Sequence, residues 1–186
     1  MKKFLIALVA MFVTVNFLSA QDYSEDPFME NDWSFKARTA YVGSIHDVFN
    51  SDGSAYLVGF EFEKMANPYV GFGPELNVAL TNGADNVLIN PSMNVKFNLT
   101  NVFAYNGERQ LFEPSLMVGL GYTLITEAHD GVCISPSARA GFDFAFNFGE
   151  NKEFAIMLSP RFYCADLNYF KDTMMLELGV GFVYHF

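Results

Sequence analysis

The sequence predicts an all-β fold, an eight-stranded antiparallel up-and-down β-barrel that crosses a membrane and has a closed, polar-plugged lumen. Three observations predict it. Apolar and polar residues alternate along most of the chain, and the alternating segments are about ten residues or longer. Apolar residues make up 51% of the chain, yet after the N-terminal segment no apolar run is long enough for a spanning helix. In a barrel only every second residue faces lipid, so the three observations agree.

Residues 1–20 predict a cleaved secretory signal peptide. Two lysines precede an apolar run that ends at the small residues Ser19 and Ala20, and the run is shorter than the roughly 20 residues of a spanning helix. Residues 21–31 are acidic and lack periodicity, which predicts a flexible N-terminal arm. Residues 32–186 then form the barrel as a single domain.

Eight segments show the period-two pattern, separated by clusters of Gly, Asn, Asp and Ser. The third, for example, places Val70, Phe72 and Leu76 on one face and Gly71 and Glu75 on the other. We expect the apolar face of each segment to contact lipid and the polar face to line the lumen. The segments are 33–43, 54–65, 69–80, 87–99, 112–122, 133–148, 154–164 and 174–186.

The connections alternate between the two ends of the predicted barrel. If the chain enters from the periplasm, the periplasmic turns are 66–67, 100–110 and 149–152. The exposed loops are then 44–53, 81–86, 125–131 and 165–172. Prolines cannot donate to a β-ladder, so we expect bulges or strand ends at Pro74, Pro91, Pro114, Pro136 and Pro160.

The predicted inward faces gather charged residues. The lumen of an eight-stranded barrel is only wide enough for side chains, so we expect these residues to form hydrogen-bonded ion pairs that fill it. An ion-conducting pore is the alternative interpretation. The five bases and six acids are Lys36, Arg38, Lys96, Arg139, Arg161, Glu61, Glu63, Glu75, Glu113, Asp143 and Glu177.

The two cysteines, Cys133 and Cys164, fall at the same end of neighbouring predicted strands. An oxidising compartment would allow a disulfide between them. Counting back from the turn near residue 150, however, leaves them about four residues out of register and on opposite faces, which disfavours the geometry that a disulfide requires. Their spacing does not match a metal site.

Four segments carry a family resemblance: 68–73 (PYVGFG), 97–100 (FNLT), 113–122 (EPSLMVGLGY) and 179–186 (GVGFVYHF). With them the chain resembles the barrel domain of the OmpA-like outer-membrane family and the related opacity-type barrels. The resemblance implies an outer-membrane location, contact with outer-membrane lipid, and a last strand that the barrel-insertion machinery reads. The residues of that assembly signal would be Val180, Phe182, Tyr184 and Phe186. No peptidoglycan-binding domain follows in the sequence, so tethering to the cell wall is not implied.

These features predict a non-enzymatic outer-membrane barrel without a cofactor, which serves envelope integrity or acts as an accessory subunit of a larger outer-membrane complex with other outer-membrane proteins. The net charge of −10 argues against nucleic acid as a partner. Three alternatives remain open: a small pore, a water-soluble lipocalin-like barrel with its faces inverted, and a lipid A-modifying enzyme. The enzyme would use a histidine beside a carboxylate and near a serine. The candidates are His46 with Asp47, near Ser44, Ser51 and Ser54, and His129 with Asp130.

Overall fold

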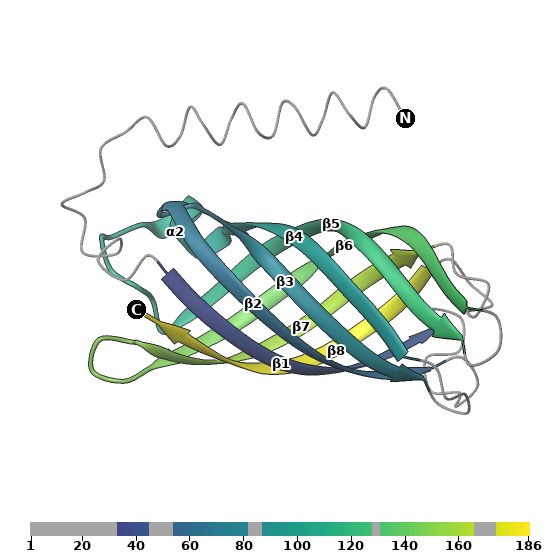
Figure 1. Cartoon of the computed structure of the whole chain (residues 1–186). Coiled ribbons are helices and arrows are strands. Elements are labelled where there is room, and N and C mark those ends of the chain that lie inside the picture. The colour runs from purple at the N-terminus through teal and green to yellow at the C-terminus, as the bar shows by residue number, and fades with distance from the viewer. Residues whose placement is uncertain (1–32, 45–53, 82–86, 128–130, 166–173) are drawn as a thin grey trace, which may run out of the picture.

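The chain folds into a closed barrel of eight strands with one short helix at one rim (Figure 1). The structure is a computed structural model that describes residues 33–44, 54–81, 87–127, 131–165 and 174–186. The predicted signal peptide (1–20) and acidic arm (21–31) lie outside the described residues. The elements are β1 (Trp33–Ser44), β2 (Ala55–Asn67), β3 (Val70–Thr81), β4 (Val87–Asn98), α2 (Leu99–Ala104), β5 (Phe112–Glu127), β6 (Gly131–Phe148), β7 (Phe154–Ala165) and β8 (Met174–His185).

The predicted up-and-down topology is confirmed. Each strand pairs antiparallel with the next, and β8 returns to pair with β1, from Ser34 opposite His185 to Ser44 opposite Met175. Trp33 and Phe186 extend this seam by exchanging backbone hydrogen bonds of 3.2 and 2.9 Å. Closure gives each of the eight described strands a partner on both sides, as a hydrocarbon environment requires.

The two ends of the barrel differ in what they hold. We call the end with the first residues of β1, β3, β5 and β7 the α2 end, and the end with their last residues the loop end (Figure 1). At the α2 end, Asn98 caps the helix by accepting a 3.1 Å hydrogen bond from the Asn101 amide. The buried Asn101 side chain donates to the Pro68 carbonyl at 2.7 Å, which fixes α2 to the turn between β2 and β3. Within the part of the chain that the structure describes, no helix is both long and apolar enough to cross a bilayer.

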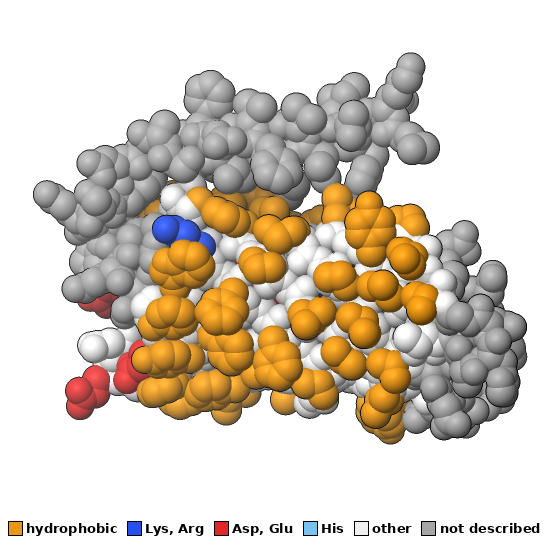
Figure 2. All heavy atoms as spheres, viewed as in Figure 1, with side chains coloured by type: hydrophobic (Ala, Val, Ile, Leu, Met, Phe, Trp, Pro, Cys, Tyr) orange, Lys and Arg blue, Asp and Glu red, His pale blue; other side chains and the backbone are white. Residues whose placement is uncertain are grey.

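Strand alternation separates an apolar exterior from a mainly polar interior. Figure 2 shows hydrophobic side chains over most of the visible barrel wall, with the charged ones at the α2 end. One predicted lipid-facing residue, Val70, is instead buried. The β2–β3 register shifts between Met65 and Asn67, and this irregularity breaks the alternation at the start of β3.

The strand prolines are accommodated in two ways. Pro114 lies near the start of β5, as expected, and Pro136 lies inside β6, one residue before the pairing with β7 begins. Pro74, Pro91 and Pro160 lie inside β3, β4 and β7, and the prediction of bulges there is wrong. At each of these three prolines the pairing on one side skips two positions and resumes in the same register. A missing donor therefore interrupts one ladder locally without displacing the strand.

Candidate functional site: the lumen

A network of buried charged side chains fills the middle of the lumen. All eleven charged residues that the sequence places there occupy inward positions, and each is less than a tenth exposed. Each of the eight strands contributes at least one of them. Charges that lie far apart along the chain therefore meet because the barrel is closed.

Glu75 of β3 lies at the centre of the network. It accepts hydrogen bonds from Arg38 Nε at 2.7 Å and from Arg161 Nη1 at 3.1 Å, and Arg139 Nη1 lies 3.6 Å away. Arg38 and Arg139 also contact Glu177, with 3.3 Å between Arg139 Nε and Glu177 Oε2. Five strands thus meet in one cluster of three guanidinium groups and two carboxylates.

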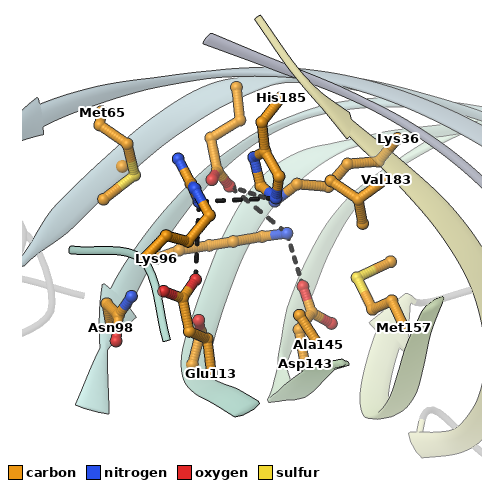
Figure 3. Close-up of a pocket in the computed structure, with 14 residues that line it drawn as sticks. Lys36, Met65, Lys96, Asn98, Glu113, Asp143, Ala145, Met157, Val183 and His185 are labelled. Atoms are coloured by element: carbon orange, nitrogen blue, oxygen red, sulfur yellow. Dashed lines mark hydrogen bonds and ion pairs between the residues drawn. The ribbon is translucent and has the colours of Figure 1, made fainter. Parts of the chain in front are cut away.

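A second layer of charges lies nearer the α2 end (Figure 3). Lys36 Nζ donates to Glu63 Oε2 at 2.6 Å. Lys96 Nζ lies 2.5 Å from Asp143 Oδ2 and 3.1 Å from Glu61 Oε1. Each lysine therefore has a carboxylate partner in a region almost closed to solvent, where an unpaired charge would be costly.

Arg161 joins the two layers. Its Nη2 donates to both oxygens of Asp143, at 2.9 and 3.0 Å, while its Nη1 donates to Glu75. The side chain is 0% exposed. Planar, multiply bonded guanidinium–carboxylate contacts are the strong class of ion pair, which makes Arg161 the principal connection between the layers.

Glycines on neighbouring strands make room for the arginines. Arg38 lies opposite Gly59 on β2 and Gly181 on β8, and Arg161 lies opposite Gly141 on β6. A Cβ at Gly181 would lie 2.8 Å from Arg38 Cβ, and one at Gly141 would lie 2.6 Å from Arg161 Cα. These inward glycines thus leave the space that the neighbouring inward arginines occupy.

Arg109 is a lumen residue that sequence reasoning missed. It lies in the connection between α2 and β5 and lines the cavity at this end of the barrel, where its Nη1 is 3.5 Å from Glu113 Oε2 and 3.5 Å from His185 Nε2. Its side chain is 10% exposed. The expected set had five bases against six acids, and Arg109 restores the balance to six against six. The excess of one acid in the expected set was the sequence signal that a further base lies in the lumen.

The loop-end half of the lumen contains an apolar cluster, which the sequence analysis also did not foresee. Inward residues there form one cluster that includes Val42, Leu57, Leu88, Ile125 and Met175, each at most 5% exposed. These residues lie on the inward-facing side of the same strands that carry the charged residues further along the barrel. The plug is therefore ionic in its centre and hydrophobic toward the loop end.

Tyr163 lies at the boundary between the two parts. Its ring belongs to the apolar cluster, and the Arg139 guanidinium carbon lies 4.9 Å from the ring centroid. Its hydroxyl contacts the Thr123 hydroxyl, and Asn90 Nδ2 donates to the same Thr123 oxygen at 2.9 Å. A short chain of hydrogen bonds thus lies between part of the ionic network and part of the aliphatic cluster.

Two cavities lined by described residues of the lumen are small. One cavity of ≈ 40 Å³ lies at the α2 end among residues that include Lys36, Arg109 and His185 (Figure 3). A second, of ≈ 20 Å³, lies in the loop-end half near Leu57 and Leu88. Sites for drug-sized ligands are about 300–1,000 Å³, so these cavities fit a few water molecules and no larger ligand.

Solved structures share this architecture, although no family model matches the chain and no curated protein matches its sequence. Neisserial surface protein A aligns with a TM-score of 0.60 and 13% identity over 83% of this chain and 97% of that one. The N-terminal β-barrel domain of Pseudomonas aeruginosa OprF gives 0.56 and 13%, over 82% and 97%. A major outer-membrane protein from Thermus thermophilus gives 0.53 and 11%, over 83% and 99%.

The chain has the fold of the small OmpA-like and opacity-type outer-membrane barrels. The resemblance expected from the sequence is confirmed at the level of fold. At these identities the likeness carries the architecture and not a particular activity.

The four residues of the predicted assembly signal lie on the outer face of this outer-membrane-type barrel. Val180, Phe182, Tyr184 and Phe186 are each 41–52% exposed. Phe182 and Tyr184 contact the Phe154 ring of β7, with centroids 5.7 and 5.3 Å apart. Reading of these side chains by the insertion machinery stays a prediction.

Cys164 is a free cysteine, and the strand register disfavours the disulfide with Cys133. Cys164 pairs with Ala138 on β6, five positions along that strand from Cys133, which pairs with Ile125 on β5. Five residues of strand span about 16 Å, far beyond the Cα separation that a disulfide allows.

The histidine sites predicted for an enzyme depend on residues outside the described part of the chain. His46, Asp47, Ser51, His129 and Asp130 lie outside the described residues. His185, the described histidine, points into the lumen beside Arg109. Among the residues that the structure describes, no three His, Cys, Asp or Glu side chains form a group able to hold a metal ion.

Proposed function

We propose that the protein is a sealed outer-membrane barrel that neither conducts nor catalyses, and that contributes to envelope integrity, on its own or as an accessory subunit of a larger outer-membrane complex. The observation that carries this proposal is the double closure of the lumen. A charge-balanced ionic network and an aliphatic cluster block it in series, and the two cavities described among their residues measure ≈ 40 and ≈ 20 Å³. A conducting barrel needs a continuous aqueous path, and each plug removes it.

The outer surface supports a membrane location. On β5 the lipid-facing residues extend from Phe112 to Tyr122, which are 43% and 60% exposed. Ten residues of strand measure about 34 Å, and a tilt of about 40° reduces this to about 25 Å along the normal, the height of an outer-membrane apolar belt. A protein with so much apolar surface is stable only where lipid or a partner covers it.

Conductance and heat-modifiable migration test the proposal together. The full-length protein, extracted in detergent and reconstituted in planar bilayers, is expected to shift its electrophoretic migration on boiling and to give no steps above the protein-free baseline. A general porin of known conductance, reconstituted in parallel, controls for insertion. Reproducible conductance steps from migration-verified protein would contradict the sealed barrel and support the small pore.

The physiological role needs a cellular test. Deletion of the gene is expected to increase sensitivity to bile salts or large antibiotics, and wild-type protein is expected to restore resistance. Stable co-purification with another barrel at fixed stoichiometry would select the accessory-subunit form of the proposal. Mass spectrometry of lipid A from the deletion strain is the counter-test, since loss of an acyl modification would support the enzyme.

A further inference from the structure

The connection between β4 and β5 exposes apolar side chains that the barrel wall does not use. In α2, Val102 is 54% and Phe103 84% exposed, and Leu111 just before β5 is 70% exposed. The helix sequence LTNVFA carries no charge. Exposed large apolar residues grouped on one segment usually mark a surface that something covers.

Two contacts set the orientation of this segment. Asn101 faces the rim, because its side chain is buried and bonded to the Pro68 carbonyl. Successive helical residues are about 100° apart, so Phe103 lies about 200° from Asn101 and points away from the rim. The Thr100 hydroxyl donates to the Phe112 carbonyl at 3.2 Å and holds the helix beside the start of β5.

The segment is continuous with the lipid-facing belt. Phe112, which follows Leu111 directly, stacks on Phe144 with centroids 6.2 Å apart and contacts Phe146 at 4.9 Å. Both partners lie on the outer face of β6. The apolar surface of the barrel wall therefore reaches Leu111 directly, and the polar residues 106–110 separate Leu111 from α2 along the chain.

Side chains at the same end have the character of a bilayer interface. Tyr105, directly after α2, contacts the Tyr69 ring with centroids 5.7 Å apart. At the same rim, Lys64 Nζ lies 5.1 Å from the Trp33 ring centroid. Tyr, Trp and a lysine with its amine extended outward are the residues that gather where acyl chains meet headgroups.

From these observations we propose that α2 and Leu111 form an interfacial membrane anchor, with Phe103 and Leu111 inserted into the headgroup region of the leaflet at the α2 end. The occupant of the apolar surface is bilayer lipid, because the surface continues the lipid-facing belt and α2 presents no charge for a protein partner to recognise. The segment would fix the depth of the barrel as an amphipathic interfacial helix does. This inference rests on the proposed membrane location.

Depth-dependent fluorescence quenching tests the anchor. Three single-tryptophan proteins are made in a Trp33→Phe background: Phe103→Trp in α2, Met93→Trp on the lipid face of β4, and Asn151→Trp at the exposed turn between β6 and β7. Each is checked for heat-modifiable migration and reconstituted in phosphatidylcholine vesicles carrying lipids brominated near the headgroup or deep in the acyl chains. The turn tryptophan reports water, and the Met93 position reports the hydrocarbon core.

The Phe103→Trp protein is expected to be quenched by shallow bromines on the order of twofold more than the Asn151→Trp protein, and to be protected from aqueous acrylamide. Quenching of Met93→Trp by deep bromines, with no lipid quenching of Phe103→Trp, would overturn the anchor and leave the barrel in the membrane. Loss of lipid quenching at both positions would overturn the anchor together with the proposed membrane location.

Discussion

The two halves of the lumen close it by opposite chemistry. In the centre and toward the α2 end, ion pairs such as Arg161–Asp143 fill the space, while toward the loop end aliphatic side chains such as Leu57 and Ile125 fill it. The ionic half gains specificity, because each charge must find a partner, but its desolvation is costly. The aliphatic half gains stability from burial alone and tolerates changes that keep its volume. The comparison shows that ion pairs and aliphatic side chains can each close part of the same lumen.

The largest expected effect lies in the ionic half. Replacing Arg161 with Leu removes the doubly bonded partner of Asp143 and one of the arginine partners of Glu75, so we expect the free energy of unfolding in lipid vesicles to fall by about 3–5 kcal/mol. Urea titration followed by heat-modifiable migration measures it. The double variant Arg161→Leu with Asp143→Leu should recover part of the loss. If the single variant is as stable as wild type, the network does not hold the barrel together.

The aliphatic half should respond through cavity formation. Ile125→Ala is expected to lower the free energy of unfolding by about 2–4 kcal/mol, since Ile125 is 1% exposed inside the barrel. Ile134→Ala on β6 is the matched control, because Ile134 is 63% exposed on the outer face and its loss opens no cavity. The same urea titration compares the two. Equal losses would show that the inward cluster is not closely packed.

The mouth at the α2 end should be less sensitive than the centre. Arg109→Gln removes the charge that faces Glu113 across 3.5 Å, and we expect a loss of about 1–2 kcal/mol because that carboxylate stays buried. Glu108→Gln changes an exposed neighbour and should shift the free energy of unfolding by less than about 0.5 kcal/mol. Indistinguishable values for the two variants would mean that Arg109 is not part of the plug.

The smallest effect is expected at the boundary. Tyr163→Phe keeps the ring in the aliphatic cluster and removes only the hydroxyl that contacts Thr123, so the expected loss is about 1 kcal/mol. Tyr122→Phe on the outer face, where the residue is 60% exposed, should be close to neutral. A double variant of Tyr163→Phe with Ile125→Ala would show by non-additivity whether the two halves act as one unit.

Much of the fold could be predicted because strand alternation is a local property that the sequence displays directly. The same alternation selected the charged residues that turned out to face inward, such as Glu75 and Arg161. It gave no warning of Arg109, because that residue lies in a connection where no period applies. Charge balance was the only guide to it.

Two other features were hidden from sequence reasoning for physical reasons. Leu57 and Ile125 lie on inward positions, but their apolar character suits lipid as well as a dry lumen, so residue type alone could not place them. The helix α2 has six residues, too few to establish a helical period, and only its cap at Asn98 marks its start. The register irregularity after Met65 likewise depends on the β3 partner and not on β2 alone.

The seam between β1 and β8 has a consequence for the timing of assembly. Ser34 lies opposite His185, so this pairing joins positions 151 apart (185 − 34). Contacts so distant in sequence form slowly. Until β8 arrives, the edge of β1 has no intramolecular partner and its backbone groups can pair with any other chain. The first strand made must therefore wait for the last, and the barrel needs a holding factor or a surface that shields that edge throughout the interval.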